Sequence, residues 1–81
     1  MQKSQELSIY KFEQLTIQYG GGAVLVAAKN MYEAIAIFKK WAIEESERTD
    51  SSMIEANKIE KIYGASYKGI SGIIYSFVYQ E

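Results

Sequence analysis

Residues 30–48, NMYEAIAIFKKWAIEESER, decide the fold, because they form the one long segment with the pattern of an amphipathic helix. Asn30 is a favourable N-cap residue, and Glu33 stands where its carboxylate can reach back to the cap amide. The segment contains neither glycine nor proline, so nothing interrupts a helix. At 100° per residue, its large apolar side chains gather on one stripe. The members of this stripe are Met31, Ala34, Ile35, Phe38, Trp41 and Ala42. The pattern predicts a helix that packs this stripe onto a sheet.

The segments before this helix have the alternating pattern of strands. Residues 7–19 and 23–28 flank three glycines at positions 20–22, which predicts a hairpin with the glycines in its turn. The alternation changes phase within the first segment, and this change predicts a bulge or bend near Glu13. Both alternating faces of residues 23–28 are apolar, so we expect this strand to be central or covered on both sides.

The segment after the helix, residues 53–63, is compatible with two structures. Ser52 and Glu55 have capping-box spacing and Gly64 can end a helix, which favours a second short helix. The alternation of apolar side chains favours a strand over about residues 58–65, and the last strand also needs a pairing partner. We predict the strand.

Residues 73–79, IIYSFVY, have the strongest β-propensity in the chain and predict the last strand. Strict alternation would place Ile73, Tyr75, Phe77 and Tyr79 on one face of it. With 81 residues, we expect a loose N-terminal segment at 1–6 and one α+β domain over 7–81. The predicted order is β-β-α-β-β, with one antiparallel sheet and a single long helix across one face.

The composition excludes several classes of site. The chain has no cysteine and no histidine, which removes disulfides, thiolate nucleophiles, histidine-based triads and the commonest metal ligands. Its net charge of -1 gives no electrostatic footprint for duplex nucleic acid or an anionic membrane. No segment has the length of a membrane span and the start has no signal-peptide pattern, so we expect a cytoplasmic protein. We predict no catalytic, cofactor-binding or metal-binding residues, and an enzymatic role is not favoured.

The apolar area exceeds what one helix can cover, and this excess predicts an interface. Whichever sheet face the helix covers, an apolar set remains on the other face. The two sets are Leu25 with Tyr75, Phe77 and Tyr79, or Val24 and Val26 with Ile74 and Val78. The helix also has an apolar flank at Tyr32, Ala36 and Ile43. Tyrosine, which occurs seven times, is enriched in interfaces.

We therefore predict a small non-catalytic protein–protein interaction module that forms a homodimer or binds another protein. The predicted contact residues are Leu25, Tyr75, Phe77 and Tyr79 of the sheet, and Tyr32, Ala36 and Ile43 of the helix flank. One alternative is a small-ligand-binding domain or weak enzyme that uses the aromatic surface as a pocket.

A second alternative is single-stranded nucleic-acid binding by aromatic stacking. Tyr75-Ser-Phe77-Val faintly resembles the stacking strand of RNA-recognition domains, whose aromatic residues lie two apart. Ile73-Ile74 stand where that family has a basic residue and a glycine. This alternative requires lysines to converge on the tyrosine face. The candidate lysines are Lys11, Lys29, Lys58, Lys61 and Lys68.

Overall fold

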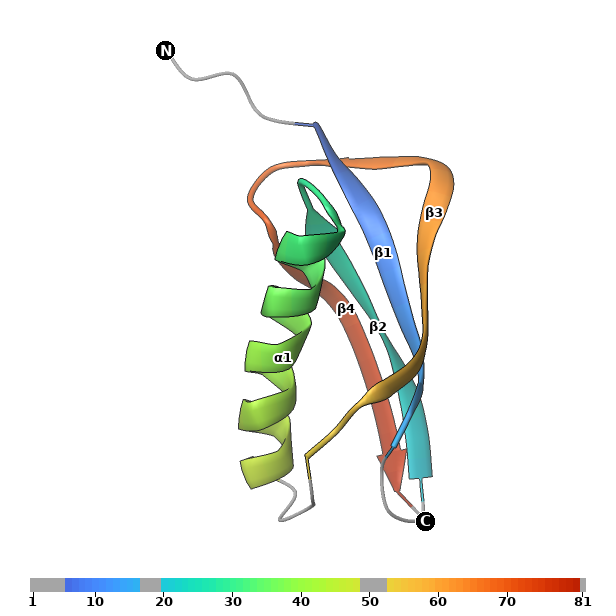
Figure 1. Ribbon diagram of the computed structural model, residues 1–81, viewed down its shortest axis with the longest axis vertical. Coiled ribbons are helices and arrows are strands. Elements are labelled where there is room, and N and C mark those ends of the chain that lie inside the picture. The colour runs from blue at the N-terminus through green and yellow to red at the C-terminus, as the bar shows by residue number, and fades with distance from the viewer. Residues whose placement is uncertain (1–5, 17–19, 49–52, 81) are drawn as a thin grey trace.

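The computed structural model of the chain describes residues 6–16, 20–48 and 53–80, with the side chains of these residues up to Val78. Its elements are β1 (Glu6–Leu15), β2 (Gly20–Ala28), α1 (Met31–Arg48), β3 (Ala56–Lys68) and β4 (Gly72–Gln80). The four strands form one antiparallel sheet in the order β3-β1-β2-β4, and α1 lies along one face (Figure 1). The predicted β-β-α-β-β order of a small α+β fold is confirmed.

The start of α1 is fixed by hydrogen bonds in both directions. The Asn30 side-chain oxygen accepts a bond of 2.9 Å from the Glu33 amide. The Glu33 carboxylate accepts one of 3.1 Å from the amide of Lys29, one residue before the expected cap position. Two hydrogen bonds lower the pKa of Glu33. The larger effect comes from the Ser71 side chain and the smaller one from the Lys29 amide. The helix therefore begins where the sequence predicts, and it is tied to the connection between β3 and β4.

The core lies between α1 and one face of the sheet. Phe12, Val24 and Val26 on the sheet are fully buried there. Phe38 of α1 stacks on Phe12 with parallel rings whose centroids are 4.4 Å apart. Since Val24 and Val26 face the helix, Leu25 between them points to the opposite face, which we call the open face.

The hairpin of β1 and β2 is confirmed, but the prediction that the glycines form its turn is wrong. Gly20, Gly21 and Gly22 belong to β2 and pair with the end of β4. The connection precedes them, and residues 17–19, once predicted as strand, lie outside the described residues. A Cβ atom on Gly22 would collide with the carbonyl oxygen of Phe77. Glycine is therefore needed at this position for the close approach of two strands.

The predicted phase change in β1 occurs at Gln14, one residue after the expected position. Gln14 has a φ of 54°, in the left-handed region. The Asn57 side chain donates a hydrogen bond of 3.1 Å to the carbonyl oxygen of Gln14. Next to it, the Thr16 amide donates to the Glu55 carbonyl at 2.8 Å, and the Glu55 amide donates to the Thr16 hydroxyl at 2.9 Å. The bend and these bonds attach the start of β3 to the end of β1.

The segment at 53–63 forms no second short helix, so that alternative is wrong. Residues from Ala56 onward are extended and pair with β1, and Ile54 just before them is buried in the core. Long-range pairing and burial outweigh the local helix signals here. The pairing of β1 with β3 shifts between Ser8 and Ile9, because β3 has extra residues there around Gly64. Gly64 has a φ of 78°, in the left-handed region. The chain then crosses from the β3 edge to β4 at the other edge (Figure 1).

Two further details correct the sequence predictions. In β4 the register shifts opposite Leu25 and Val26, and Ile73 packs against the core instead of sharing a face with Tyr75. At the N-terminus, residues 1–5 of the predicted loose segment lie outside the described residues, whereas Glu6 already pairs with Lys68.

Candidate functional site

The open face carries an apolar half over β2 and β4. Residues directly opposite each other in antiparallel strands share a face. Leu25 lies opposite Tyr75, and Ala23 lies opposite Phe77. Tyr75 is 54% exposed and Phe77 is 51% exposed, although both belong to a strand of the sheet. We call Leu25, Tyr75 and Phe77 the aromatic patch.

The part of the open face over β1 and β3 that lies beside the aromatic patch is charged. Lys58 lies opposite Glu13, and Glu60 lies opposite Lys11, so that the signs alternate. The Lys11 ammonium forms ion pairs with Glu13 and, at 3.4 Å, with Glu60. The hydrogen bonds to Glu13 and Glu60 raise the pKa of Lys11, and the bond to Lys11 lowers the pKa of Glu13. These four charges compensate each other, and further along the same face Ile9 lies opposite Ile62 and Ala27, so the open face is apolar there too.

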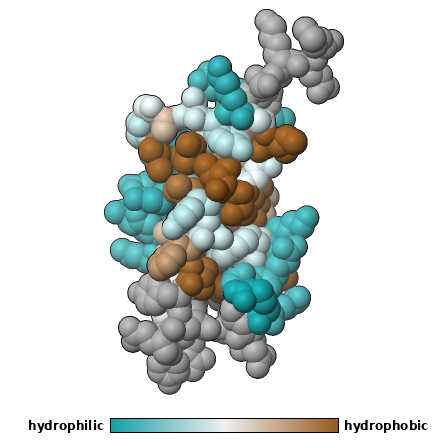
Figure 2. Space-filling model, turned by 180° about the vertical axis from the view of Figure 1, so that it is seen from behind, coloured by the Kyte–Doolittle hydropathy of each residue, from teal (hydrophilic) through white to brown (hydrophobic). Residues whose placement is uncertain are grey.

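Hydrophobic side chains also gather visibly on the surface. Figure 2, which views the molecule from behind, shows them as a broken band across the middle, with hydrophilic side chains on both flanks. The exposed large apolar residues of the described chain lie on the strands, on α1 and in the connections beside β3. An apolar surface bordered by polar groups is the usual anatomy of a contact region.

The structure divides the predicted contact residues into two groups. Leu25, Tyr75 and Phe77 are brought together on the open face. Tyr79 continues β4 opposite Gly21, but its side chain lies outside the described residues. The helix residues belong to an element on the opposite face of the sheet and do not extend the patch. They are Tyr32, Ala36 and Ile43, all exposed, with Tyr32 at 86%.

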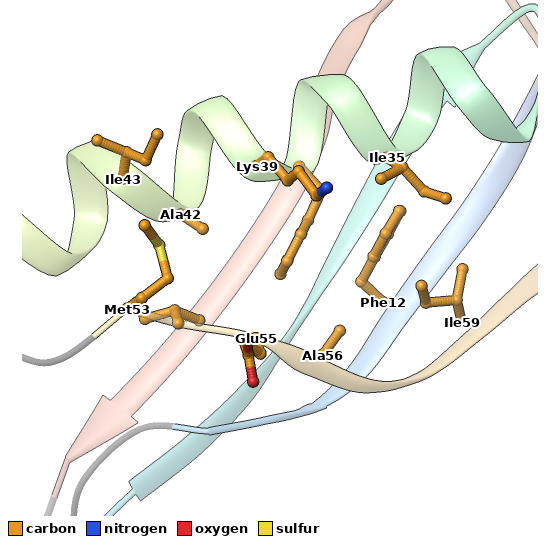
Figure 3. A pocket seen from close by; sticks show the side chains of 11 residues that line it. Phe12, Ile35, Lys39, Ala42, Ile43, Met53, Glu55, Ala56 and Ile59 are labelled. Carbon is orange, nitrogen blue, oxygen red and sulfur yellow. The ribbon is translucent and has the colours of Figure 1, made fainter.

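A groove between α1 and the start of β3 was missed by the sequence analysis (Figure 3). It exists because α1 packs on β2, β4 and β1 and leaves the side next to β3 uncovered. Its volume is about 380 Å³, its floor includes Phe12 and Phe38, and its walls include Ile43, Met53 and Ile59. The one signal in the sequence was the run of apolar residues in the ambiguous segment after the helix.

The chemistry of this groove is limited to the burial of apolar groups. Its polar side chains are Lys39 and Glu55, which are both exposed, and Glu55 points away from the helix in Figure 3. No tyrosine of the described ranges lines it. Among the described residues no carboxylate is buried and no cluster of acidic side chains could hold a metal ion. The aromatic surface predicted as a pocket is a separate and outward-facing part of the sheet.

The lysines required for nucleic-acid stacking do not converge on the aromatic patch. Lys11 and Lys58 lie in the charged part of the open face, beside carboxylates. Lys61 lies opposite Tyr10, a core residue, and its ammonium is 5.5 Å from the centre of the Tyr63 ring. Lys68 lies opposite Glu6 on the β3 edge, and Lys29 follows the end of β2. Within the described residues, no positively charged track therefore runs beside the aromatic rings.

Comparisons with known proteins assign no family to this arrangement. No protein-family model matches the sequence, and neither a curated protein nor a solved structure matches it. In the part of the chain that the structure describes, no helix is both long and apolar enough to cross a membrane. The function must therefore be argued from the geometry of the open face.

Proposed function

We propose that this protein is a small protein-interaction module that forms a homodimer through the aromatic patch. The observation that carries the proposal is the half-exposure of Tyr75 and Phe77, side by side on a sheet face that α1 does not cover. Exposed apolar surfaces of this kind mark interfaces in small soluble domains, and aromatic residues are enriched at the centre of such interfaces.

The exposed fractions of Tyr75 and Phe77 limit how much free energy their burial in a dimer can contribute. Full burial of a large apolar side chain contributes roughly 1.5–3 kcal/mol. Because Tyr75 and Phe77 are already half-buried, each has only about half of this left to gain. The patch therefore supports a dimer that dissociates on dilution, and its melting temperature should rise with protein concentration.

Sedimentation of the wild-type chain and of the Phe77→Lys variant tests this proposal. We expect a concentration-dependent dimer for the wild type and a folded monomer for Phe77→Lys, because a charge at the centre of the patch opposes its burial. The matched control is Tyr32→Lys, which changes an exposed ring on α1 and should leave the dimer intact. A wild-type monomer of normal stability at high micromolar concentration would refute the proposal. Dissociation by Tyr32→Lys alone would move the interface to the helix flank.

A further inference from the structure

The two edge strands of the sheet are protected to very different degrees. An edge strand presents unpaired backbone groups that can pair with another chain, and lysines and bulges block such pairing. The β3 edge carries Lys58, Lys61 and Lys68 and is irregular around Gly64. The β4 edge, GIIYSFVYQ, carries no charged residue and no proline. Of the two edges, β4 is therefore the one without charged residues, and it pairs regularly with β2 from Tyr75 onward, past the register shift at Ile74.

No other described element pairs with the outer edge of β4. Helix α1 packs against β4, but a gap of about 280 Å³ separates Lys40 and Glu44 of the helix from Gly72 and Ile73 of the strand. Ser76 in the middle of β4 is exposed. The midpoint of β4 is therefore accessible to solvent.

The sequence of β4 indicates which strand would fit there. Read outward from Ser76, it has an aromatic residue on each side, Tyr75 and Phe77, and then a β-branched residue on each side, Ile74 and Val78. A twofold dimer requires a surface that is complementary to itself. Two antiparallel copies of one strand meet this condition when the types of residue along the strand read the same in both directions. Tyr75 and Phe77 meet this condition about Ser76, whereas Ile74 lies in the register shift and Val78 packs against the core.

We propose that two copies of this chain pair antiparallel along β4, with the twofold axis at Ser76, to form one continuous sheet. This inference rests on the proposed self-association and specifies its geometry. Tyr75 of each copy would lie opposite Phe77 of the other on the open face, an aromatic cross-strand pair. The two aromatic patches would meet at the seam. The lysine-protected β3 strands would remain as the outer edges.

A charge exchange at the axis provides the test. Residue 76 would lie opposite itself, so Ser76→Lys and Ser76→Glu should each weaken the dimer by about tenfold or more, because like charges meet at the seam. An equimolar mixture of the two variants should restore dimerisation, as a heterodimer identified by native mass spectrometry. Ala65→Lys, at an exposed position of the β3 edge, is the matched control and should leave the dimer unchanged. Circular dichroism confirms that each variant is folded.

The outcomes separate this inference from the proposed function. A wild-type monomer would overturn both. A dimer that survives Ser76→Lys and Ser76→Glu but is dissociated by Leu25→Lys would overturn the edge pairing and support stacking of the open faces. Dissociation by both Ser76 variants without recovery in the mixture would also overturn it, since the axis would then lie elsewhere. As an independent measurement, nitroxide labels on Ser76→Cys should lie closer together in the dimer than labels on Ala65→Cys.

Discussion

Over β2 and β4, both faces of the sheet carry apolar residues, yet only the face beneath α1 is sealed. On the helix side, Phe12, Val24 and Val26 are fully buried beneath α1. On the open face, Tyr75 and Phe77 remain half-exposed, although the strand that carries them has no charged residue. The difference comes from the single helix, which can cover one face of a four-stranded sheet and even there leaves a groove beside β3.

This contrast teaches that strand composition alone does not distinguish core from contact surface. An apolar residue on a strand becomes core only when another layer packs on it. The predictions below test whether the two faces differ in stability as they differ in burial, beginning with the largest expected effect.

Truncation of a ring on each face should give the largest contrast. Phe12→Ala removes a fully buried ring that stacks on Phe38, and it should cost about 3–5 kcal/mol in free energy of unfolding. Phe77→Ala, at a protein concentration where the chain is monomeric, should cost less than about 1.5 kcal/mol, since half of that ring is already in water. Chemical denaturation followed by the fluorescence of the single tryptophan, Trp41, measures both. If Phe12→Ala does not fold, Phe12→Leu gives a smaller loss of the same sign. Equal losses at the two positions would contradict the assignment of the faces.

The junction of β2 and β4 should be sensitive at one glycine and tolerant at another. Gly22→Ala would force a Cβ atom against the Phe77 carbonyl and should cost about 1–3 kcal/mol. Gly72→Ala is the matched control, because nothing lies within 4 Å of its added atom, and its effect should stay within about 0.5 kcal/mol. Thermal unfolding of both variants measures the difference. A neutral Gly22→Ala would show that the strands do not approach closely there.

The smallest effects should come from two carboxylates whose pKa values are lowered in the folded chain. The Lys11 hydrogen bond lowers the pKa of Glu13 on the open face, and the Ser71 bond lowers that of Glu33 at the helix start. A lowered folded pKa contributes stability above the usual value of 4.5, and this contribution is lost as the pH falls through the folded value. Melting temperatures measured from neutral to acidic pH should therefore fall less steeply below that value in Glu13→Gln and Glu33→Gln. Ser71→Ala should reproduce part of the Glu33→Gln effect, and an unchanged acid slope in all three would refute the assignment.

The helix and the element order could be predicted because their signals are local. The N-cap at Asn30 and the 3.6-residue stripe through Phe38 depend on neighbours within the same segment. The direct link from β2 to α1 through Lys29 and Asn30 then requires the helix to fold back over the hairpin. The separation of Val24 and Val26 from Leu25 follows from alternation in the same way.

The errors and the open alternative occurred where distant segments decide the conformation. The glycines at 20–22 have the composition of a turn, but β4 approaches them and makes them strand. Residues 53–63 are predicted as strand with a helix as the alternative, and only the pairing with β1 from Ala56 onward decides between the two. Ile73 fits a regular alternation, but the register shift opposite Leu25 and Val26 turns it to the core.

The sequence by itself determined that this chain has one capped helix, strands on both sides of it and more apolar surface than that helix can cover. Only the tertiary structure decided which apolar residues are left outside, because Leu25, Tyr75 and Phe77 become a patch only when β2 and β4 pair with the open face away from α1. Local periodicity is set by backbone geometry within each segment. Exposure depends on which segments pack on each other, and that is a property of the whole chain.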